Sequence, residues 1–287
     1  MPQANTRPAP LALSTHAFAA PLLLGGARAC LWRPLLHHYS VRLSRKVRKL
    51  FSTDTLASLW EHAARLSHPV DAKRILATID PAEIARITEH YPRRPGARKT
   101  NAWQDAAHWI DINVDRAQNL WLDRSPPLRI LDLGSGAGYF LYVCQFLGHS
   151  GLGLDLDDDP FFGAMTKYFN VPRVIWRIDP GIPLPDLREK FDLITGHRVC
   201  FHRITRDEND VWKEWTPANW KFFINDVRAR FLKPRGRLLL EFLPRPDGSS
   251  FFSEELRACF LAQGARIFRR KTLLSADPKE RPRFKEI

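Results

Sequence analysis

Arg129-Ile-Leu-Asp-Leu-Gly-Ser-Gly-Ala-Gly-Tyr139 is the most informative segment of this 287-residue chain. It has the pattern of a buried strand that runs into three glycines at alternate positions and then into a helix. Glycine accepts positive φ and, because it lacks a Cβ, lets a ligand lie directly on the main chain. The segment therefore predicts a turn whose backbone contacts a nucleoside.

The spacing of these glycines limits which nucleoside the turn can hold. Gly134, Gly136 and Gly138 give G-x-G-x-G, whereas the dinucleotide fingerprint is G-x-G-x-x-G. The third glycine of the fingerprint lets helix and strand pack closely around a pyrophosphate, and Tyr139 occupies that place here. The spacing favours a nucleoside other than a dinucleotide. On this motif alone, a glycine turn without a ligand stays open as the alternative.

Further apolar runs follow the glycine turn in the order that a parallel sheet requires. They are residues 151–155, 173–178, 191–195, 236–242 and 265–269. Strands that alternate with helical stretches indicate an α/β fold, in which ligands bind at the carboxyl ends of the strands. Asp155 ends the first run, 19 residues after Gly136, and Asp179 follows the second. A carboxylate in the place of Asp155 can accept both ribose hydroxyls, and the alternative is that it caps a helix before Pro160.

In order and spacing, these features resemble the class I S-adenosylmethionine-dependent methyltransferases. The stretch 131–138 is similar to the first motif of the family, and phrases such as Phe191-Asp-Leu-Ile-Thr195 recur at its fourth strand. The resemblance covers residues 123–275 and implies a Rossmann-like, doubly wound α/β fold with N-terminal helices. Its seven-stranded sheet has the order 3-2-1-4-5-7-6. Only residues 283–287 are left for the seventh strand, so we expect that strand to be short or missing.

The same resemblance implies S-adenosyl-L-methionine as the cofactor and assigns residues to its parts. Asp132 and the glycine turn would hold the methionine end, Asp155 the ribose, and Ile178 with Asp179 the adenine. The complete cofactor-binding set is Asp132, Gly134, Ser135, Gly136, Gly138, Asp155, Leu156, Ile178 and Asp179. Because N-terminal helices often cover the cofactor in this family, His108, Asp111 and Asn113 are further candidates, against the alternative of solvated polar positions.

Methyl transfer does not require a catalytic side chain, because a methyl group on a sulfonium is already electrophilic. Well-oriented positioning contributes about 7–11 kcal/mol, against roughly 10²–10⁴-fold from a general base. A base would lie just beyond the fourth strand, where His197 and His202 are the candidates, since the unperturbed pKa of histidine is about 6.5. For each, a hydrogen-bonded structural role is the alternative. The Asn/Asp-Pro-Pro-aromatic tetrapeptide of enzymes that methylate exocyclic base amines is absent.

Three tryptophans follow this region, at Trp212, Trp215 and Trp220. They have two interpretations. Large aromatic side chains near the expected site can form a wall or lid over a substrate. They also dock insertions onto a core, which is the commoner use.

The chain divides into three predicted parts: a disordered basic extension at 1–53, a helical N-terminal cap at 54–122 and a methyltransferase domain at 123–287. The extension carries eight Lys and Arg residues and no acid, and an organelle presequence and a secretory signal are its competing interpretations. Its apolar run at 17–27 is shorter than the roughly 20 residues that span a bilayer, which predicts no membrane segment. In the cap, Asp80-Pro81 opens one helix, and an apolar face from Trp103 to Trp121 marks another.

The charge balance and the cysteines indicate which binding partners and which cellular compartment to expect. Of the 44 basic residues, eight lie in the extension, which leaves 36 against 31 acidic residues. So small a surplus does not demand a nucleic-acid surface, and nucleic acid is not favoured as a partner. The four cysteines and ten histidines have no metal-ligand spacing, which predicts no metal, and the cysteines favour a reducing, cytoplasmic location. The oligomeric state stays open.

The sequence thus predicts an enzyme that transfers a methyl group from S-adenosyl-L-methionine to an unidentified small-molecule O or N acceptor. Three alternatives remain: an RNA-directed methyltransferase that uses the basic tail, an NAD(P)-binding Rossmann oxidoreductase, and a cofactor-binding protein without activity.

Overall fold

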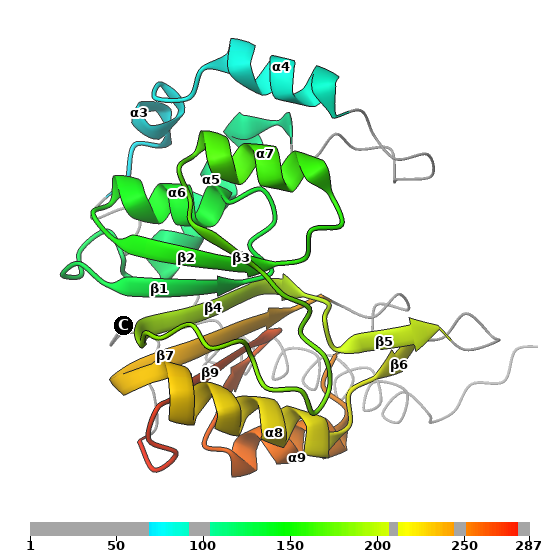
Figure 1. Cartoon of the computed structure of the whole chain (residues 1–287). Coiled ribbons are helices and arrows are strands. Elements are labelled where there is room, and N and C mark those ends of the chain that lie inside the picture. The colour runs from blue at the N-terminus through cyan, green and yellow to red at the C-terminus, as the bar shows by residue number, and fades with distance from the viewer. Residues whose placement is uncertain (1–68, 92–103, 207–211, 244–250, 281–287) are drawn as a thin grey trace, which may run out of the picture. The chain divides into compact units, whose positions relative to one another are not determined.

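The structure is a computed structural model that describes residues 69–91, 104–206, 212–243 and 251–280 (Figure 1). All of these belong to one compact unit of the chain, Thr53–Ile287. The predicted extension at 1–53 and part of the predicted cap lie outside the described residues. The division of the chain at residues 53 and 122 stays a prediction.

Within the described residues, a seven-stranded sheet has the order β3-β2-β1-β4-β7-β9-β8. Its strands are β1 (Arg129–Leu133), β2 (Ser150–Asp155), β3 (Arg173–Ile175), β4 (Phe191–Val199), β7 (Leu232–Phe242), β8 (Arg266–Phe268) and β9 (Lys271–Ser275). The first five in this order pair in parallel, and β9 runs antiparallel to both β7 and β8. Counted along the chain within this sheet, the order is 3-2-1-4-5-7-6. The fold is a doubly wound, Rossmann-like α/β fold, and its strand order is the one that the sequence predicts.

The seventh strand is present, which makes the expectation that it is short or missing wrong. It is β9, which follows β8 directly through a turn at residues 269–270. Arg269 has φ of 51° in that turn. Two-residue hairpin turns need such left-handed backbone and usually place Gly or Asn there. The sequence pattern placed the sixth strand within one residue of β8, but Arg269 carries no turn signal, so nothing indicated that the seventh strand follows directly.

Helices cover both faces of the sheet (Figure 1). One face carries α3 (Ala72–Leu76), α4 (Pro81–His90), α5 (Ala106–Asn119), α6 (Tyr139–Phe146) and α7 (Pro160–Tyr168); the other carries α8 (Pro217–Asp226), the π-helical turn η2 (Val227–Phe231) and α9 (Glu254–Ala262). Side chains alternate along each strand, so Ile130 joins one hydrophobic core and its neighbour Leu131 joins the other. This alternation explains why the strands are apolar throughout.

Aspartates cap the first turns of two helices that precede the sheet. Asp80 caps α4 by accepting the N–H of Ala82 at 2.8 Å, with Pro81 in the first turn as predicted. Asp105 caps α5 in the same way, through the N–H of His108. This helix ends two residues before Trp121, whose φ of 59° is left-handed and stops the helix earlier than the apolar pattern predicted.

A two-stranded hairpin, β5 (Arg203–Arg206) and β6 (Trp212–Glu214), projects after β4. Two of the three tryptophans anchor it: Trp215 and Trp220 are buried with ring centroids 4.9 Å apart. Phe201 packs 5.3 Å from Trp215. These contacts support the docking interpretation for both tryptophans over a substrate wall. The side chain of Trp212 lies outside the described residues.

Candidate functional site

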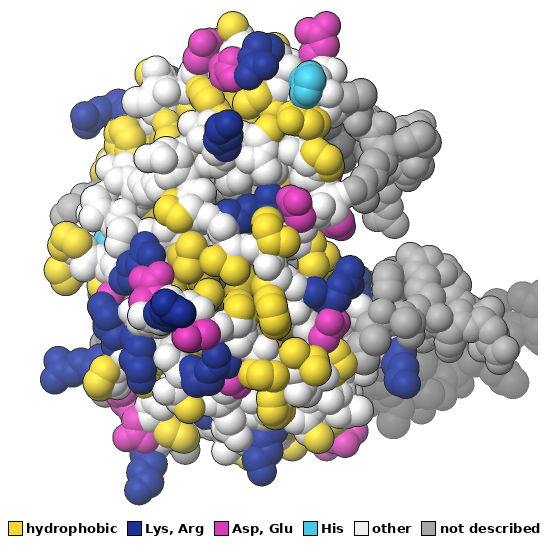
Figure 2. Space-filling model, in the orientation of Figure 1, with side chains coloured by type: hydrophobic (Ala, Val, Ile, Leu, Met, Phe, Trp, Pro, Cys, Tyr) yellow, Lys and Arg dark blue, Asp and Glu magenta, His cyan; other side chains and the backbone are white. Residues whose placement is uncertain are grey.

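A cavity of about 610 Å³ lies at the carboxyl ends of β1, β2 and β4, within the size range of small-molecule sites. Its lining combines backbone of the glycine turn with aromatic, acidic and arginine side chains. Hydrophobic side chains gather across the centre of the face in Figure 2, with charged side chains around them. Trp176 is 36% exposed and also lines the cavity.

The glycine turn opens toward this cavity. Gly134 has φ of +74°, and a Cβ on it would meet nothing within 4 Å, so the turn leaves open space above its backbone. Gly134, Ser135 and Gly136 all line the cavity. Gly138 does not, because its role is internal: with φ of +82° it starts α6, and a Cβ on it would lie 3.0 Å from the Thr166 Cγ2 atom.

The side chain of Ser135 is buried between the glycine turn and β2. Its Oγ atom is buried and has no hydrogen-bond partner in the part of the chain that the structure describes. Space for Ser135 comes from Gly153 in β2, since a Cβ there would lie 2.5 Å from the Ser135 Oγ atom. The sequence prediction missed this use of Gly153, although a glycine inside a strand often marks a close approach of another group.

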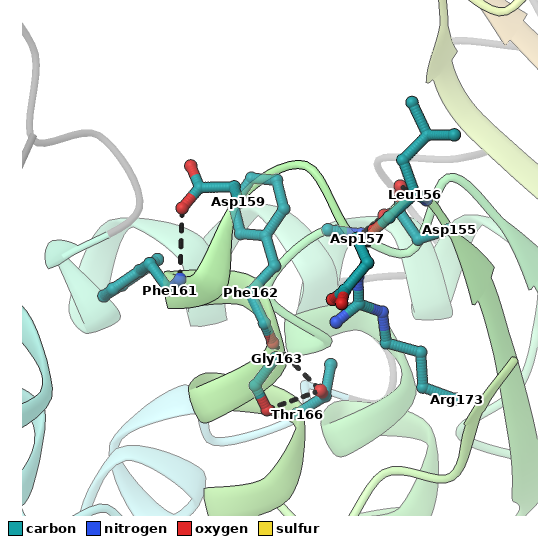
Figure 3. Close-up of polar contacts among 10 residues, drawn as sticks. Asp155, Leu156, Asp157, Asp159, Phe161, Phe162, Gly163, Thr166 and Arg173 are labelled. Carbon is teal, nitrogen blue, oxygen red and sulfur yellow. Dashed lines mark hydrogen bonds and ion pairs between the residues drawn. The ribbon is translucent and has the colours of Figure 1, made fainter. Parts of the chain in front are cut away.

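Asp155 joins the end of β2 to the glycine turn. Its Oδ2 atom accepts the N–H of Gly136, and its Oδ1 atom accepts the N–H of Leu156 at 2.7 Å. Burial raises the pKa of Asp155, and these hydrogen bonds partly offset the rise. The helix cap is another residue, Asp159, which accepts the N–H of Phe161 at 3.1 Å (Figure 3). Asp155 lines the cavity and does not cap α7.

Arg173, which the sequence prediction did not single out, holds the loop after Asp155. Its Nη2 atom donates to the carbonyl oxygen of Leu156 and lies 3.4 Å from the Asp157 carboxylate (Figure 3). The Arg173 side chain is only 7% exposed. Gly163 leaves room for it, because a Cβ there would lie 3.3 Å from the guanidinium. Arg173 therefore fixes the backbone on which Asp155 and Leu156 sit.

Asp132 ends β1 deep in the cavity. Its Oδ1 atom accepts a hydrogen bond from the Thr195 hydroxyl at 2.7 Å. Burial raises the pKa of Asp132 to about 7, against the opposing effects of Thr195 and the Arg116 cation.

Arg116 and Asn113 reach the cavity from α5, joined by a 3.0 Å hydrogen bond. The other two candidates on this helix, His108 and Asp111, are exposed and do not line the cavity.

The three remaining members of the predicted cofactor set also line the cavity. They are Leu156, Ile178 and Asp179. Ile178 is buried and Asp179 is half-buried, so this wall offers an apolar surface beside a carboxylate. Phe201 and Trp176 add aromatic surface to the same cavity.

His197 lines the cavity as a neutral imidazole. Its Nδ1 atom lies 3.4 Å from the Glu241 Oε2 atom, and its ring packs 4.6 Å from the ring of Phe140. Burial and the nearby Arg116 cation lower the pKa of His197 to about 4. Burial raises the pKa of Glu241, but the hydrogen bond with His197 and the Arg116 and Lys271 cations outweigh it and set that pKa at about 2.

His202 lies in the hydrophobic core instead of the cavity. It is fully buried, with its ring centroid 4.7 Å from that of Phe251 and 5.9 Å from that of Trp220. It is not among the residues that line the cavity. The polypeptide turns after Cys200, which directs this side chain under the hairpin, so its position does not support the predicted role of a base.

Among known proteins, the chain is similar to solved structures. No protein-family model matches the chain, and no curated protein matches it. An amino pentose methyltransferase from Micromonospora echinaspora, solved with SAM bound, matches at 17% identity and a TM-score of 0.41, over 64% of this chain and 100% of that chain. DesVI from Streptomyces venezuelae matches at 13% identity and a TM-score of 0.41, over 68% and 98%. A TehB-like SAM-dependent methyltransferase from Corynebacterium glutamicum matches at 18% identity and a TM-score of 0.34, over 55% and 84%.

In the described ranges, no three His, Cys, Asp or Glu side chains come together in a way that could hold a metal ion. Nor does any helix there combine the length and apolar character that crossing a bilayer requires.

Proposed function

We propose that the protein is an S-adenosyl-L-methionine-dependent methyltransferase that acts on a small-molecule O or N acceptor. The observation that carries the proposal is a single cavity that joins an open glycine turn to three carboxylates. Asp132 lies near the end of β1, Asp155 is the last residue of β2, and Asp179 follows β3. These three strands are neighbours in the sheet, and all three carboxylates line that cavity. Ligands of open α/β sheets bind at this edge.

The residues present fit the cofactor. The backbone of Gly134, Ser135 and Gly136, with the open space above Gly134, would receive the methionine end, with Asp132 as the partner of its ammonium group. Each Asp155 oxygen accepts one backbone N–H and keeps a second lone pair for a ribose hydroxyl. The wall of Ile178 and Asp179 would contact the adenine.

When bound, the cofactor supplies an electrophilic methyl group, so the main tasks of the protein are positioning and exclusion of water. Positioning of this kind contributes about 7–11 kcal/mol. His197 stays neutral at physiological pH, since burial holds its pKa near 4. With Nδ1–H directed to Glu241, its Nε2 atom is an acceptor, but so low a pKa makes it a weak base. His197 therefore has an orienting role in this proposal.

Isothermal titration with S-adenosylhomocysteine and with NADH tests the proposal against the oxidoreductase alternative. We expect the first to bind and the second not to. Tyr139, where a dinucleotide site has its third glycine, is buried and packs 5.0 Å from Phe169, so a pyrophosphate has no close approach there. Binding of NADH in competition with S-adenosylhomocysteine would overturn it.

A small acceptor is favoured over RNA because the cavity, at about 610 Å³, has the size of a small-molecule site. The basic tail on which the RNA alternative depends lies outside the described residues. RNA affinity of the full chain and of a chain beginning at residue 54, measured across salt concentrations, tests that alternative. The cytoplasmic location belongs to the same proposal, since the cofactor pool is cytosolic.

A further inference from the structure

Two arginines line the part of the cavity next to β4. Arg198 and Arg203 both line the cavity, and neither forms an ion pair or a side-chain hydrogen bond within the described residues. The Nε atom of Arg203 is buried without a hydrogen-bond partner. The carboxylates Asp155 and Asp179 line the cavity from the ends of β2 and β3. The cavity lining thus combines carboxylates with arginines, and Arg177, two residues before Asp179, is one of these arginines.

A β-bulge brings Arg198 to the cavity. The pairing of β4 with β7 shifts register between Gly196 and Val199. In a regular strand His197 and Arg198 would face opposite sides of the sheet, yet both line the cavity. Arg198 has φ of 56°, a left-handed conformation that is uncommon for a residue with a Cβ. Bulges and such backbone outliers concentrate next to functional sites, where they redirect side chains.

Arg203 is held by the anchor of the hairpin. Its backbone N–H donates to the carbonyl oxygen of Cys200 at 3.0 Å, which closes a turn at the end of β4. The two residues before it, Phe201 and His202, pack against Trp215 and Phe251. The neighbouring side chains hold the backbone of Arg203, and its guanidinium forms no ion pair with any residue that the structure describes, which leaves it available for a ligand.

We propose that Arg198 and Arg203 bind an oxyanion of the methyl acceptor, a carboxylate or a phosphate. The planar guanidinium donates two parallel hydrogen bonds to either group. Arg116 is not part of this pair, because Asn113 and Glu241 already contact its guanidinium at 3.0 and 3.8 Å. The inference rests on the proposed function, which places the cofactor at the glycine turn, Asp155 and Ile178 and leaves the part of the cavity next to β4 for the acceptor.

Calorimetry on the full chain saturated with S-adenosylhomocysteine tests the inference with four probes: benzoate, phenyl phosphate, and the uncharged benzamide and benzyl alcohol. We expect at least one anion to bind about tenfold more tightly than both uncharged probes, as charged hydrogen bonds would give. The benzoate and phenyl phosphate arms separate a carboxylate acceptor from a phosphate acceptor. Arg198→Gln with Arg203→Gln should remove the preference. Arg257→Gln, an exposed arginine on α9, is the matched control.

Equal affinity for charged and uncharged probes in the wild type would overturn the inference, and so would a preference that survives in the double variant. Arg198→Gln alone, which changes an exposed side chain, gives the same test if the double variant does not fold. A 20-nucleotide RNA whose binding needs both arginines, while benzoate and phenyl phosphate do not compete, would also overturn it. Failure of the proposed function is distinguishable, since S-adenosylhomocysteine itself would then not bind.

Discussion

The variant Asp155→Asn tests whether the carboxylate of Asp155 binds the cofactor or is only a polar group at the end of β2. The two Asp155 oxygens accept the N–H groups of Gly136 and Leu156, the second at 2.7 Å. Asparagine has nearly the same shape but only one oxygen, so one of these N–H groups would face an NH₂ group. A buried donor without an acceptor costs about 1–3 kcal/mol. That range corresponds to roughly 5- to 150-fold in an equilibrium constant.

We expect Asp155→Asn to lower the melting temperature by about 2–12 °C. S-adenosylhomocysteine should also bind roughly tenfold or more weakly, since the ribose loses a charged acceptor. Calorimetric titration and thermal unfolding measure the two effects. Asp158→Asn is the matched control, because Asp158 is exposed and makes no side-chain hydrogen bond with any described residue. Equal losses in both variants, or an unchanged dissociation constant for Asp155→Asn, would refute this role of Asp155.

Three further variants test other parts of the site. Burial raises the pKa of Asp132 to about 7, so the stability it adds is present at low pH and is lost as pH rises through about 7. The melting temperature of Asp132→Asn should therefore change less between pH 5 and 8 than that of wild type. Parallel plots of melting temperature against pH for the two proteins would contradict this. Gly153→Ala places a Cβ 2.5 Å from the Ser135 Oγ atom and should cost about 1–3 kcal/mol in urea unfolding; Ser135→Gly should restore the loss, and a failed rescue would place the strain elsewhere. His202→Ala removes a buried ring and should cost about 3–5 kcal/mol while the folded protein keeps its affinity for S-adenosylhomocysteine; unchanged stability would speak against a core role.

Much of the site was predictable because parallel strands bring their carboxyl ends to one edge. A short glycine turn after β1 and acids after β2 and β3 appear in the sequence as local patterns. Once the strand order is expected, Asp132, Asp155 and Asp179 must meet, and all three line the cavity. No long-range information is needed to find them.

The missed features depend on contacts between segments that are distant in sequence. Arg173 holds a loop 17 residues before it, and Arg116 reaches the cavity from a helix that precedes the sheet. Neither has a local signal, since arginine is common on surfaces. His202 failed as a candidate base for a related reason: residue type suggested chemistry, but the turn after Cys200 buried the side chain among aromatic rings.

A crystal structure with S-adenosylhomocysteine tests the central claim most directly. We expect density in the 610 Å³ cavity, with the ammonium group at Asp132, the ribose hydroxyls at Asp155 and the adenine against Ile178. Density for the ligand elsewhere on the protein, or an empty cavity at saturating ligand, would contradict the claim.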